Sequence, residues 1–257
     1  MMLKTITAFI LQTFREAIRN KILYGIGFFA VAILLFSLVL GELSLNEQVR
    51  VIRDVGMTFI MIMAVALGIY AGVSMIHKEI DRRIIYTVLS KPIRRSEFIV
   101  GRFLGIALTL FVELLSMFVV FLGILVVRDI PIDAVLFQAF ILVYVKSLIV
   151  AATALMFSTF SGAVLSSLMS LGIFIIGSLY DQFTYFAGRS DSPASRAVMY
   201  GAQFLLPNLA HLNLSTQVSY SLDVPWTHVA WSGASGLIYC VVLLCIACIV
   251  FEKRDFI

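Results

Sequence analysis

The sequence predicts an all-α membrane protein that crosses the bilayer six times. Of its 257 residues, 61% are hydrophobic and only 13% are charged, whereas a soluble domain has roughly 45–50% apolar and about 25% charged residues. Such a chain has too little polar surface to cover a water-soluble globule. Helices can cross lipid because they satisfy their backbone hydrogen bonds internally. No stretch suggests a separate soluble domain, so we expect a single transmembrane domain over residues 1–257.

The expected spans are apolar runs with few charges, and each is close to the length of about 20 residues that crosses a bilayer. They cover residues 22–41, 55–76, 103–127, 135–159, 162–180 and 231–251. The first run follows a polar leader and has no small-residue cleavage site after it, which favours an anchor over a removable signal peptide. The last run contains Cys240, Cys245 and Cys248 without metal-ligand spacing, so they are interpreted as small apolar residues.

Lysine and arginine are distributed unequally between the two predicted sides of the membrane. Thirteen of the nineteen lie in the N-terminal segment, the 77–102 loop or the C-terminus, and five lie on the other side. Cytoplasmic loops carry such an excess, so both termini and the 77–102 loop are predicted to be cytoplasmic in a cytoplasmic (inner) membrane. The basic balance therefore reflects topology and lipid headgroups, and we expect no nucleic-acid partner.

Residues 1–21 are predicted to form an amphipathic helix rather than a span. At 100° per residue, one half of the helical wheel is apolar and the other half is polar. The apolar half contains Leu3, Ile6, Phe9, Ile10, Phe14, Ala17 and Ile18, and the polar half contains Lys4, Gln12, Arg15, Glu16 and Arg19. The pattern is typical of a helix that lies flat in the membrane interface, although a frayed leader is the alternative.

Residues 77–102 combine charge with helical periodicity. Ile80, Ile84, Ile85, Val88 and Leu89 recur at helical spacing. Pro92 is expected to end that helix because proline has no N–H to donate, and Ser96 can cap the next helix. The sequence therefore predicts a helix–turn–helix hairpin that projects from the membrane. Two interpretations are open: a solvated basic loop, or a docking element for a cytoplasmic partner.

Four motifs follow one another along the chain: "TFREAIRNKILYG", "YTVLSKPIRRSEFIVGRFLG", "FLLPNLAHLNL" and "FEKRDF". In this order they resemble the N-terminal elbow helix, the cytoplasmic signature, the segment before the last span and the terminal tag of the ABC-2-type permeases, the membrane subunits of type-2 ABC exporters. The family pattern often has Gly-Thr where this chain has Ile85 and Tyr86 before Thr87, which leaves the subfamily and the substrate open. The resemblance implies the type-2 ABC exporter fold.

The resemblance also implies partners. The elbow helix and the 77–102 coupling hairpin would sit in grooves on two cytoplasmic ABC ATPase subunits, beneath two permease subunits that are copies or relatives. The coupling residues implied by this comparison are Glu79, Arg82, Arg83, Lys91, Arg94 and Arg95. The chain has no G-x-x-x-x-G-K-[ST] phosphate loop, so it is expected to be no enzyme and to bind no cofactor itself, with ATP and Mg on the partner ATPase. The alternative is a membrane scaffold or signal relay that an ATPase moves without moving a solute.

Small residues recur four apart in two predicted spans. They are Ala64, Gly68 and Gly72 in the second span, and Gly162, Ser166 and Ser170 in the fifth. In lipid, small residues at this spacing let helix backbones approach closely. They indicate either packing within one subunit or a subunit interface beside the pathway.

Two ionisable residues, Glu113 and Lys146, lie near mid-membrane in the third and fourth predicted spans. A charge there is costly and is expected to face a partner or a water-filled cavity. The two could form an ion pair, or they could contact substrate or protons. Beyond the fifth span, residues 181–230 are expected to form short extracytoplasmic helices that shield the exit of the pathway, with His211 and His228 as loop residues rather than metal ligands.

Overall fold

The computed structural model describes residues 2–19, 27–28, 31–32, 35–36, 39, 47–81, 95–182, 185 and 207–252. The regular elements of the described ranges are α-helices. The helices are α1 (Met2–Ile18), α3 (Gln48–Asp81), α5 (Arg95–Val127), α6 (Ala134–Ser158), α7 (Ala163–Ser178), α10 (Ser215–Ser219) and α11 (Trp226–Glu252). The all-α, polytopic fold predicted from composition is therefore confirmed.

Among the described helices, α3, α5, α6 and α11 contain segments long and apolar enough to cross a membrane, whereas α7 has 16 residues and is shorter. The expected first span, residues 22–41, lies largely outside the described residues. The count of six spans thus stays a prediction. Helices α3 and α5 also extend beyond the apolar runs predicted at 55–76 and 103–127, because each includes polar residues at the end nearest the 77–102 hairpin.

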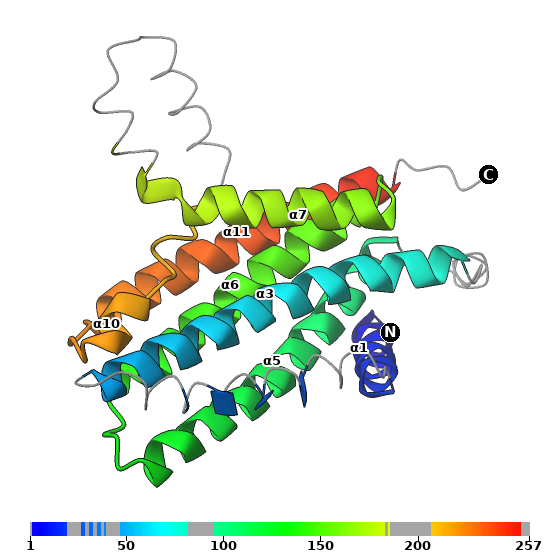
Figure 1. Cartoon of the computed structure of the whole chain (residues 1–257). Coiled ribbons are helices and arrows are strands. Elements are labelled where there is room, and N and C mark those ends of the chain that lie inside the picture. The colour runs from blue at the N-terminus through cyan, green and yellow to red at the C-terminus, as the bar shows by residue number, and fades with distance from the viewer. Residues whose placement is uncertain are drawn as a thin grey trace.

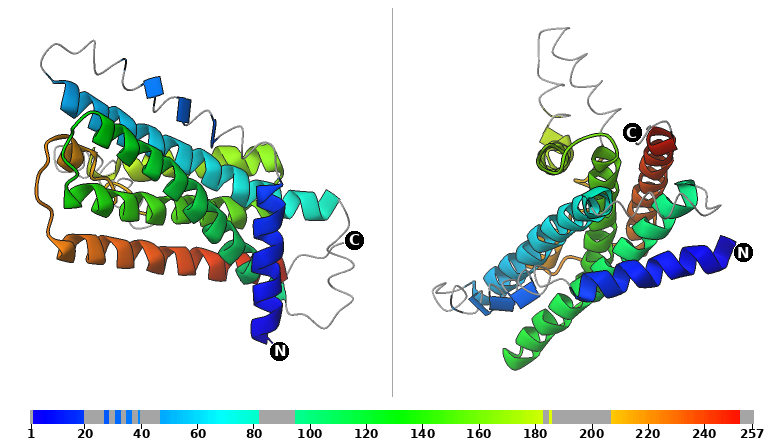
Figure 2. Two further views of the ribbon diagram at one scale, coloured as in Figure 1. Left: turned by 90° about the horizontal axis from the view of Figure 1, so that it is seen from below. Right: turned by 90° about the vertical axis from the view of Figure 1, so that its right-hand side faces the viewer.

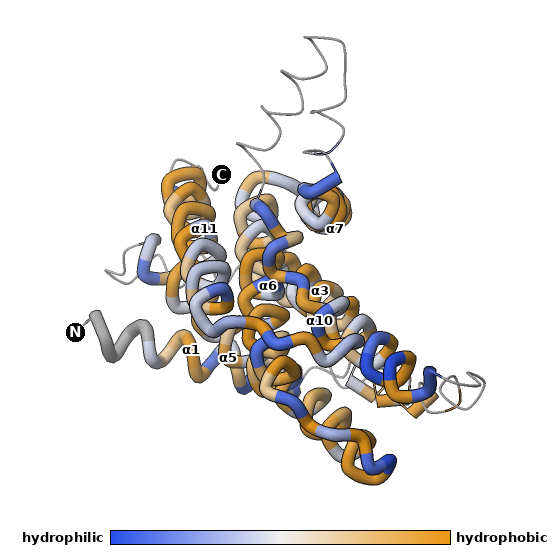
Figure 3. The backbone as a smooth tube through the Cα atoms, turned by 90° about the vertical axis from the view of Figure 1, so that its left-hand side faces the viewer, coloured by the Kyte–Doolittle hydropathy of each residue, from blue (hydrophilic) through white to orange (hydrophobic). Residues whose placement is uncertain are grey.

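Helix α6 occupies the centre of the bundle and packs against α3, α5, α7 and α11. Helices α5 and α7 lie on opposite sides of the α3–α6 pair (Figure 1). Helix α1 crosses the bundle at one end instead of running along it (Figure 2). Most hydrophilic segments lie toward the ends of the long helices, which are mainly hydrophobic between them (Figure 3).

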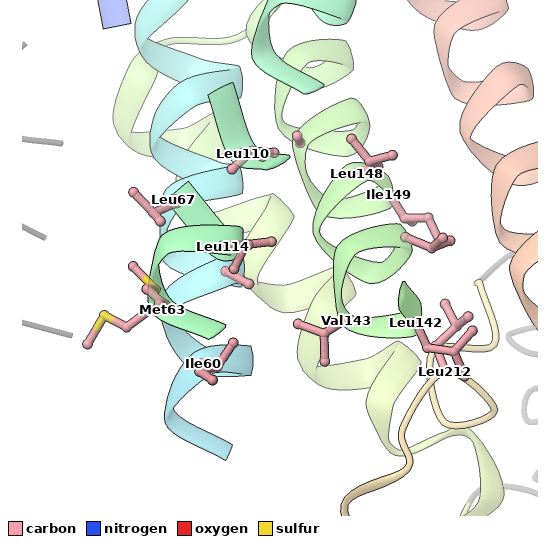
Figure 4. Close-up of a cluster of buried hydrophobic side chains, with 14 of the residues drawn as sticks. Ile60, Met63, Leu67, Leu110, Leu114, Leu142, Val143, Leu148, Ile149 and Leu212 are labelled. Atoms are coloured by element: carbon pink, nitrogen blue, oxygen red, sulfur yellow. The ribbon is translucent and has the colours of Figure 1, made fainter. Parts of the chain in front are cut away.

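Large apolar side chains from three long helices fill the middle of the bundle (Figure 4). They include Ile60, Met63 and Leu67 of α3, Leu110 and Leu114 of α5, and Leu142, Val143, Leu148 and Ile149 of α6. Leu212, which precedes α10, joins them. In lipid, apolar burial alone gives helices little reason to associate, so close packing and polar contacts must hold them together. The sites below are built from those two kinds of contact.

The two ends of the bundle hold different elements. The hairpin end holds α1, the last turn of α3, the first turn of α5 and the last turn of α11, as the Phe9–Phe98 and Phe98–Phe251 ring contacts show. The opposite end holds the start of α3, residues 128–133 and α10.

Candidate functional site

The two arms of the predicted coupling hairpin are continuous with long helices. Helix α3 runs past the apolar stretch to Asp81, which places Glu79 in its last turn, and α5 begins at Arg95. Arg82, Arg83, Lys91 and Arg94 lie outside the described residues. A displacement of either arm is therefore passed directly into a membrane helix, because no flexible joint separates Glu79 or Arg95 from the apolar part of its helix.

Helix α1 docks in a groove that two glycines of α5 create. A Cβ atom added to Gly101 would lie 2.9 Å from Cβ of Phe9, and one added to Gly105 would lie 2.7 Å from Cγ2 of Thr13. Both distances are too short for real side chains, so only glycine permits this approach. The "GRFLG" sequence is a G-x-x-x-G pattern of the kind that lets helices pack closely in membranes.

Arg102 lies between these glycines and reinforces the docking. Its side chain is 2% exposed. Its Nη1 donates a hydrogen bond of 2.9 Å to Thr13 Oγ1 and lies 3.9 Å from Glu16 Oε2. The guanidinium also lies 5.7 Å from the centroid of the Phe9 ring. A buried arginine needs such partners because an unpaired charge at this depth is strongly unfavourable.

Aromatic contacts extend this cluster to the last helix. The rings of Phe9 and Phe98 meet edge-on with centroids 5.6 Å apart, and Phe98 stacks on Phe251 at 5.9 Å. Phe251 is in the last turn of α11 and is buried. We call Phe9, Thr13, Phe98, Arg102 and Phe251 the hairpin-end cluster; it joins α1, α5 and α11.

The small residues of α3 pack within the chain. A Cβ added to Gly68 would lie 3.0 Å from the Ser147 carbonyl oxygen, and one added to Gly72 would lie 2.6 Å from the Ala151 carbonyl oxygen. Ala64 is also buried. In the structure this stripe therefore packs against α6 of the same chain, and a place at a subunit interface stays a prediction.

The small residues of α7 divide into two kinds. Ser166 and Ser170 are buried, whereas Gly162 is the exposed N-cap of the helix with no atom within 4 Å of an added Cβ. Ser170 donates a hydrogen bond to the Ser166 carbonyl oxygen. Helix α7 contacts α3 and α6, so Ser166 and Ser170 also serve packing within the chain.

Glu113 and Lys146 do not form an ion pair within 4 Å in the structure. Helix α5 packs on the face of α6 that carries Tyr144, whose hydroxyl donates to the Ala107 carbonyl oxygen at 3.1 Å. Lys146 follows Tyr144 by two residues and therefore points about 200° away around the helix. It meets Met61 of α3 and Phe174 of α7 instead. Glu113 is half-buried, and its Oε2 has no hydrogen-bond partner among the described residues.

A polar network at the opposite end was not anticipated from the sequence. Arg53 of α3 is fully buried and donates to Asp133 Oδ2 at 2.7 Å, to the Ser221 hydroxyl and to the Pro131 carbonyl oxygen. At the next residue of α3, Asp54 Oδ1 accepts a hydrogen bond of 2.9 Å from the Ser219 hydroxyl. These bonds tie α3 to two connections that lie 78 and 168 residues away in the chain.

Replacing Arg53 with methionine is expected to lower the free energy of unfolding by about 3 kcal/mol. Breaking a buried ion pair typically costs 3–5 kcal/mol, and the low end applies because the side chain of Asp133 is 35% exposed. Arg50→Met is the matched control, since Arg50 lies on the same helix with a 44% exposed side chain. Unfolding of the purified protein by SDS titration measures both; equal losses would show that the network has no special role.

An open hollow of about 530 Å³ adjoins this network. It is lined by Glu47, by residues 48–50 of α3 and by Ser219, Tyr220 and Ser221. The Arg50 guanidinium lies 4.0 Å from the centroid of the Tyr220 ring. Charged and aromatic groups at this end suit the boundary between membrane and water.

The sequence matches a known protein family over most of its length. The model of the ABC-2 family of transporter proteins matches residues 8–256. The chain belongs to the ABC-2 family. ABC-2 proteins are membrane permease subunits of ABC transporters and work with ABC ATPase subunits, so the chain is a multi-pass membrane permease. No curated protein gives a significant match to this ABC-2 permease.

The match covers α1 from residue 8 onward and the last turn of α11, so the hairpin-end cluster lies within the family region. The sequence alone located the elbow helix and the hairpin arms, but it did not identify Arg102, Arg53 or the glycine groove of α5. The groove could have been found, because "GRFLG" has the same four-residue spacing that was noticed in α3.

Proposed function

We propose that this ABC-2 permease exports a substrate across the cytoplasmic membrane, with both termini and the 77–102 hairpin on the cytoplasmic side. Two ATPase subunits would dock on the hairpin and on α1, beneath two permease subunits. The lopsided distribution of lysine and arginine supports this orientation. ATP and Mg would be bound by the ATPase subunits, and this chain would supply the pathway.

The proposal depends on one observation: the helices at the hairpin end are joined to one another by direct contacts or through the hairpin. Glu79 and Arg95 belong to α3 and α5, and the hairpin-end cluster joins α5 to α1 and α11. A push from an ATPase on the hairpin would therefore move four helices together. Because bundles of packed helices shift as rigid bodies rather than deform continuously, such a push would change the packing around α6 and open the pathway outward.

Reversing the charges of Glu79, Arg82 and Arg83 is expected to abolish co-purification of the ATPase subunits while membrane insertion stays intact. These groups would make charged contacts with the ATPase surface, and like-charge juxtaposition across an interface costs several kcal/mol. Pull-down of the tagged permease from solubilised membranes measures the association.

The matched control reverses Arg50 and Arg128, which lie at the opposite end of the bundle. This control variant is expected to retain the ATPase. Retention by the hairpin variant as well would remove the coupling assignment.

A further inference from the structure

Lys146 is almost completely buried, and the described side chains around it do not neutralise its charge. The residue is 1% exposed in the central helix α6. Its Nζ lies 3.7 Å from Met61 Sδ and 5.9 Å from the centroid of the Phe174 ring. No described carboxylate lies within 4 Å of this nitrogen. A thioether and an aromatic ring attract a cation only weakly.

The neighbouring helices cannot supply an anion near this depth. Helix α7 has no acidic residue at all, and α3 has none between Asp54 and Glu79. Asp54 already accepts the Ser219 hydroxyl at the opposite end, and Glu79 lies in the last turn at the hairpin end. Glu113 belongs to α5, which packs on the other face of α6. The side of α6 that faces α3 and α7 therefore presents one positive group and no negative one.

Stability does not explain a lysine at this position. An apolar side chain of similar volume, such as methionine, would pack against Met61 and Phe174 without the desolvation penalty that a buried charge carries. An intramembrane cation without a partner is by default a functional group. The missing component is an anion that arrives from outside the chain.

Helix α7 contributes Phe174 beside this lysine, and most residues of α7 are not buried. Only Ser166, Ser170 and Gly177 of α7 are buried. The buried Ser166 hydroxyl has no hydrogen-bond partner among the residues that the structure describes. Since few residues of α7 are buried, moving α7 away from α3 and α6 disrupts less buried packing than moving α6 would.

The outer face of α7 indicates what kind of molecule could approach. It exposes large apolar side chains along its length, namely Val164, Leu165, Leu168, Met169, Leu171, Ile175 and Ile176. A hydrocarbon chain can lie against such a surface at no cost in hydrogen bonds. A molecule that combines a hydrocarbon chain with an anionic head would match both the outer face of α7 and the lysine beneath it.

We propose that Lys146 binds the anionic head of an amphiphilic cargo, a phosphate or carboxylate carried on a hydrocarbon chain, when α7 moves away from α3 and α6. This inference rests on the proposed transport function and adds the class of substrate. Lys146 lies near the middle of its span, where a head crossing between leaflets has lost its water. The ammonium replaces that water at the costliest point of the crossing.

Binding of matched dodecyl compounds tests the proposal. The full-length chain is placed in phosphatidylcholine nanodiscs and titrated with dodecyl phosphate, dodecanoate, dodecyltrimethylammonium and dodecyl maltoside. We expect at least one anionic compound to bind tenfold or more tightly than the cationic and neutral ones. The two anionic arms distinguish a phosphate head from a carboxylate head. Equal binding of all four compounds would overturn the proposal.

Two variants locate the effect. K146M is expected to fold, to retain the ATPase subunits in pull-down and to lose the anion preference, whereas K146R is expected to keep it. Arg50→Gln, at the opposite end, serves as the control and should keep the preference. An unchanged preference in K146M, or failure of K146M to fold, would overturn the proposal, because the second result would make the ammonium structural. Neither outcome affects the hairpin experiment, so the two proposals fail separately.

Discussion

Replacing Gly72 with alanine is expected to destabilise the helix bundle by at least about 1–3 kcal/mol, the usual cost of overpacking a well-filled core. The added methyl group would lie 2.6 Å from the Ala151 carbonyl oxygen and 2.7 Å from Ala154 Cβ. Neither atom belongs to a flexible side chain that could move aside. Helices α3 and α6 would have to separate, and the close contact that holds helices together in lipid would be lost along the interface.

Gly123→Ala is the matched control for this prediction. Gly123 lies in α5, and a Cβ added there meets no atom within 4 Å. Alanine has a better helix propensity than glycine, so this variant should be neutral or slightly more stable. The fraction folded in an SDS titration measures both variants. Equal behaviour of the two would mean that the Gly68–Gly72 contact does not hold α3 against α6.

The helices that are apolar enough to cross the membrane could be predicted, because the composition and length of an apolar run show whether lipid or water surrounds it. A stretch of about 20 apolar residues has few alternatives to a membrane helix. The ends of the helices were harder to predict. Helix α3 begins at Gln48 and includes Arg53, although hydropathy alone would place a charged residue at the boundary of a span. The structure buries Arg53 within a helix because Asp133, Ser221 and Pro131 surround it. Those partners are distant in the chain, so no local pattern reveals them.

The face that each helix presents could be predicted only in part. The wheel of residues 1–21 separates apolar from polar side chains, but Thr13 is buried against Arg102 and Leu11 is exposed. A helical wheel sorts residues by their affinity for water and does not distinguish lipid from protein. The same limit explains why depth alone suggested that Glu113 and Lys146 could pair. Pairing also requires facing helices, and α5 faces Tyr144 rather than Lys146.

The coupling residues illustrate a different limit. Glu79, Arg82, Arg83, Lys91, Arg94 and Arg95 were assigned from the family resemblance, and their roles stay predictions. Of these six residues, the structure describes only Glu79, near the end of α3, and Arg95, at the start of α5, and it describes only their backbone. Their function depends on a surface of another polypeptide. The physical chemistry of a single chain can therefore identify exposed charged residues, but it cannot identify the surface of the partner protein that binds them.

Replacing Gly105 with alanine is expected to release α1 from the bundle without unfolding the bundle. The added Cβ would press on Thr13, whose Cγ2 would lie 2.7 Å away and whose branched side chain is stiff at χ1. Overpacking of about 1–3 kcal/mol corresponds to roughly a fivefold to 150-fold rise in the undocked population. Helix α1 packs chiefly on α5, so it can leave while the α3–α6 contact persists.

Trypsin measures this release, because Arg15 and Arg19 are exposed and become cleavable when α1 leaves α5 and unwinds. Gly105→Ala should raise the cleavage rate about tenfold, while its SDS unfolding curve stays near that of the natural sequence. Gly101→Ala should give a smaller increase, since its Cβ would lie 2.9 Å from Cβ of Phe9. Gly123→Ala, on the same helix but outside the groove, should leave cleavage unchanged. If Gly105→Ala is cleaved no faster than Gly123→Ala, the glycine groove does not hold α1. The hairpin-end cluster would then no longer explain how one ATPase contact moves α1 together with α5, and only the continuity of α3 and α5 with the hairpin would support the proposed coupling.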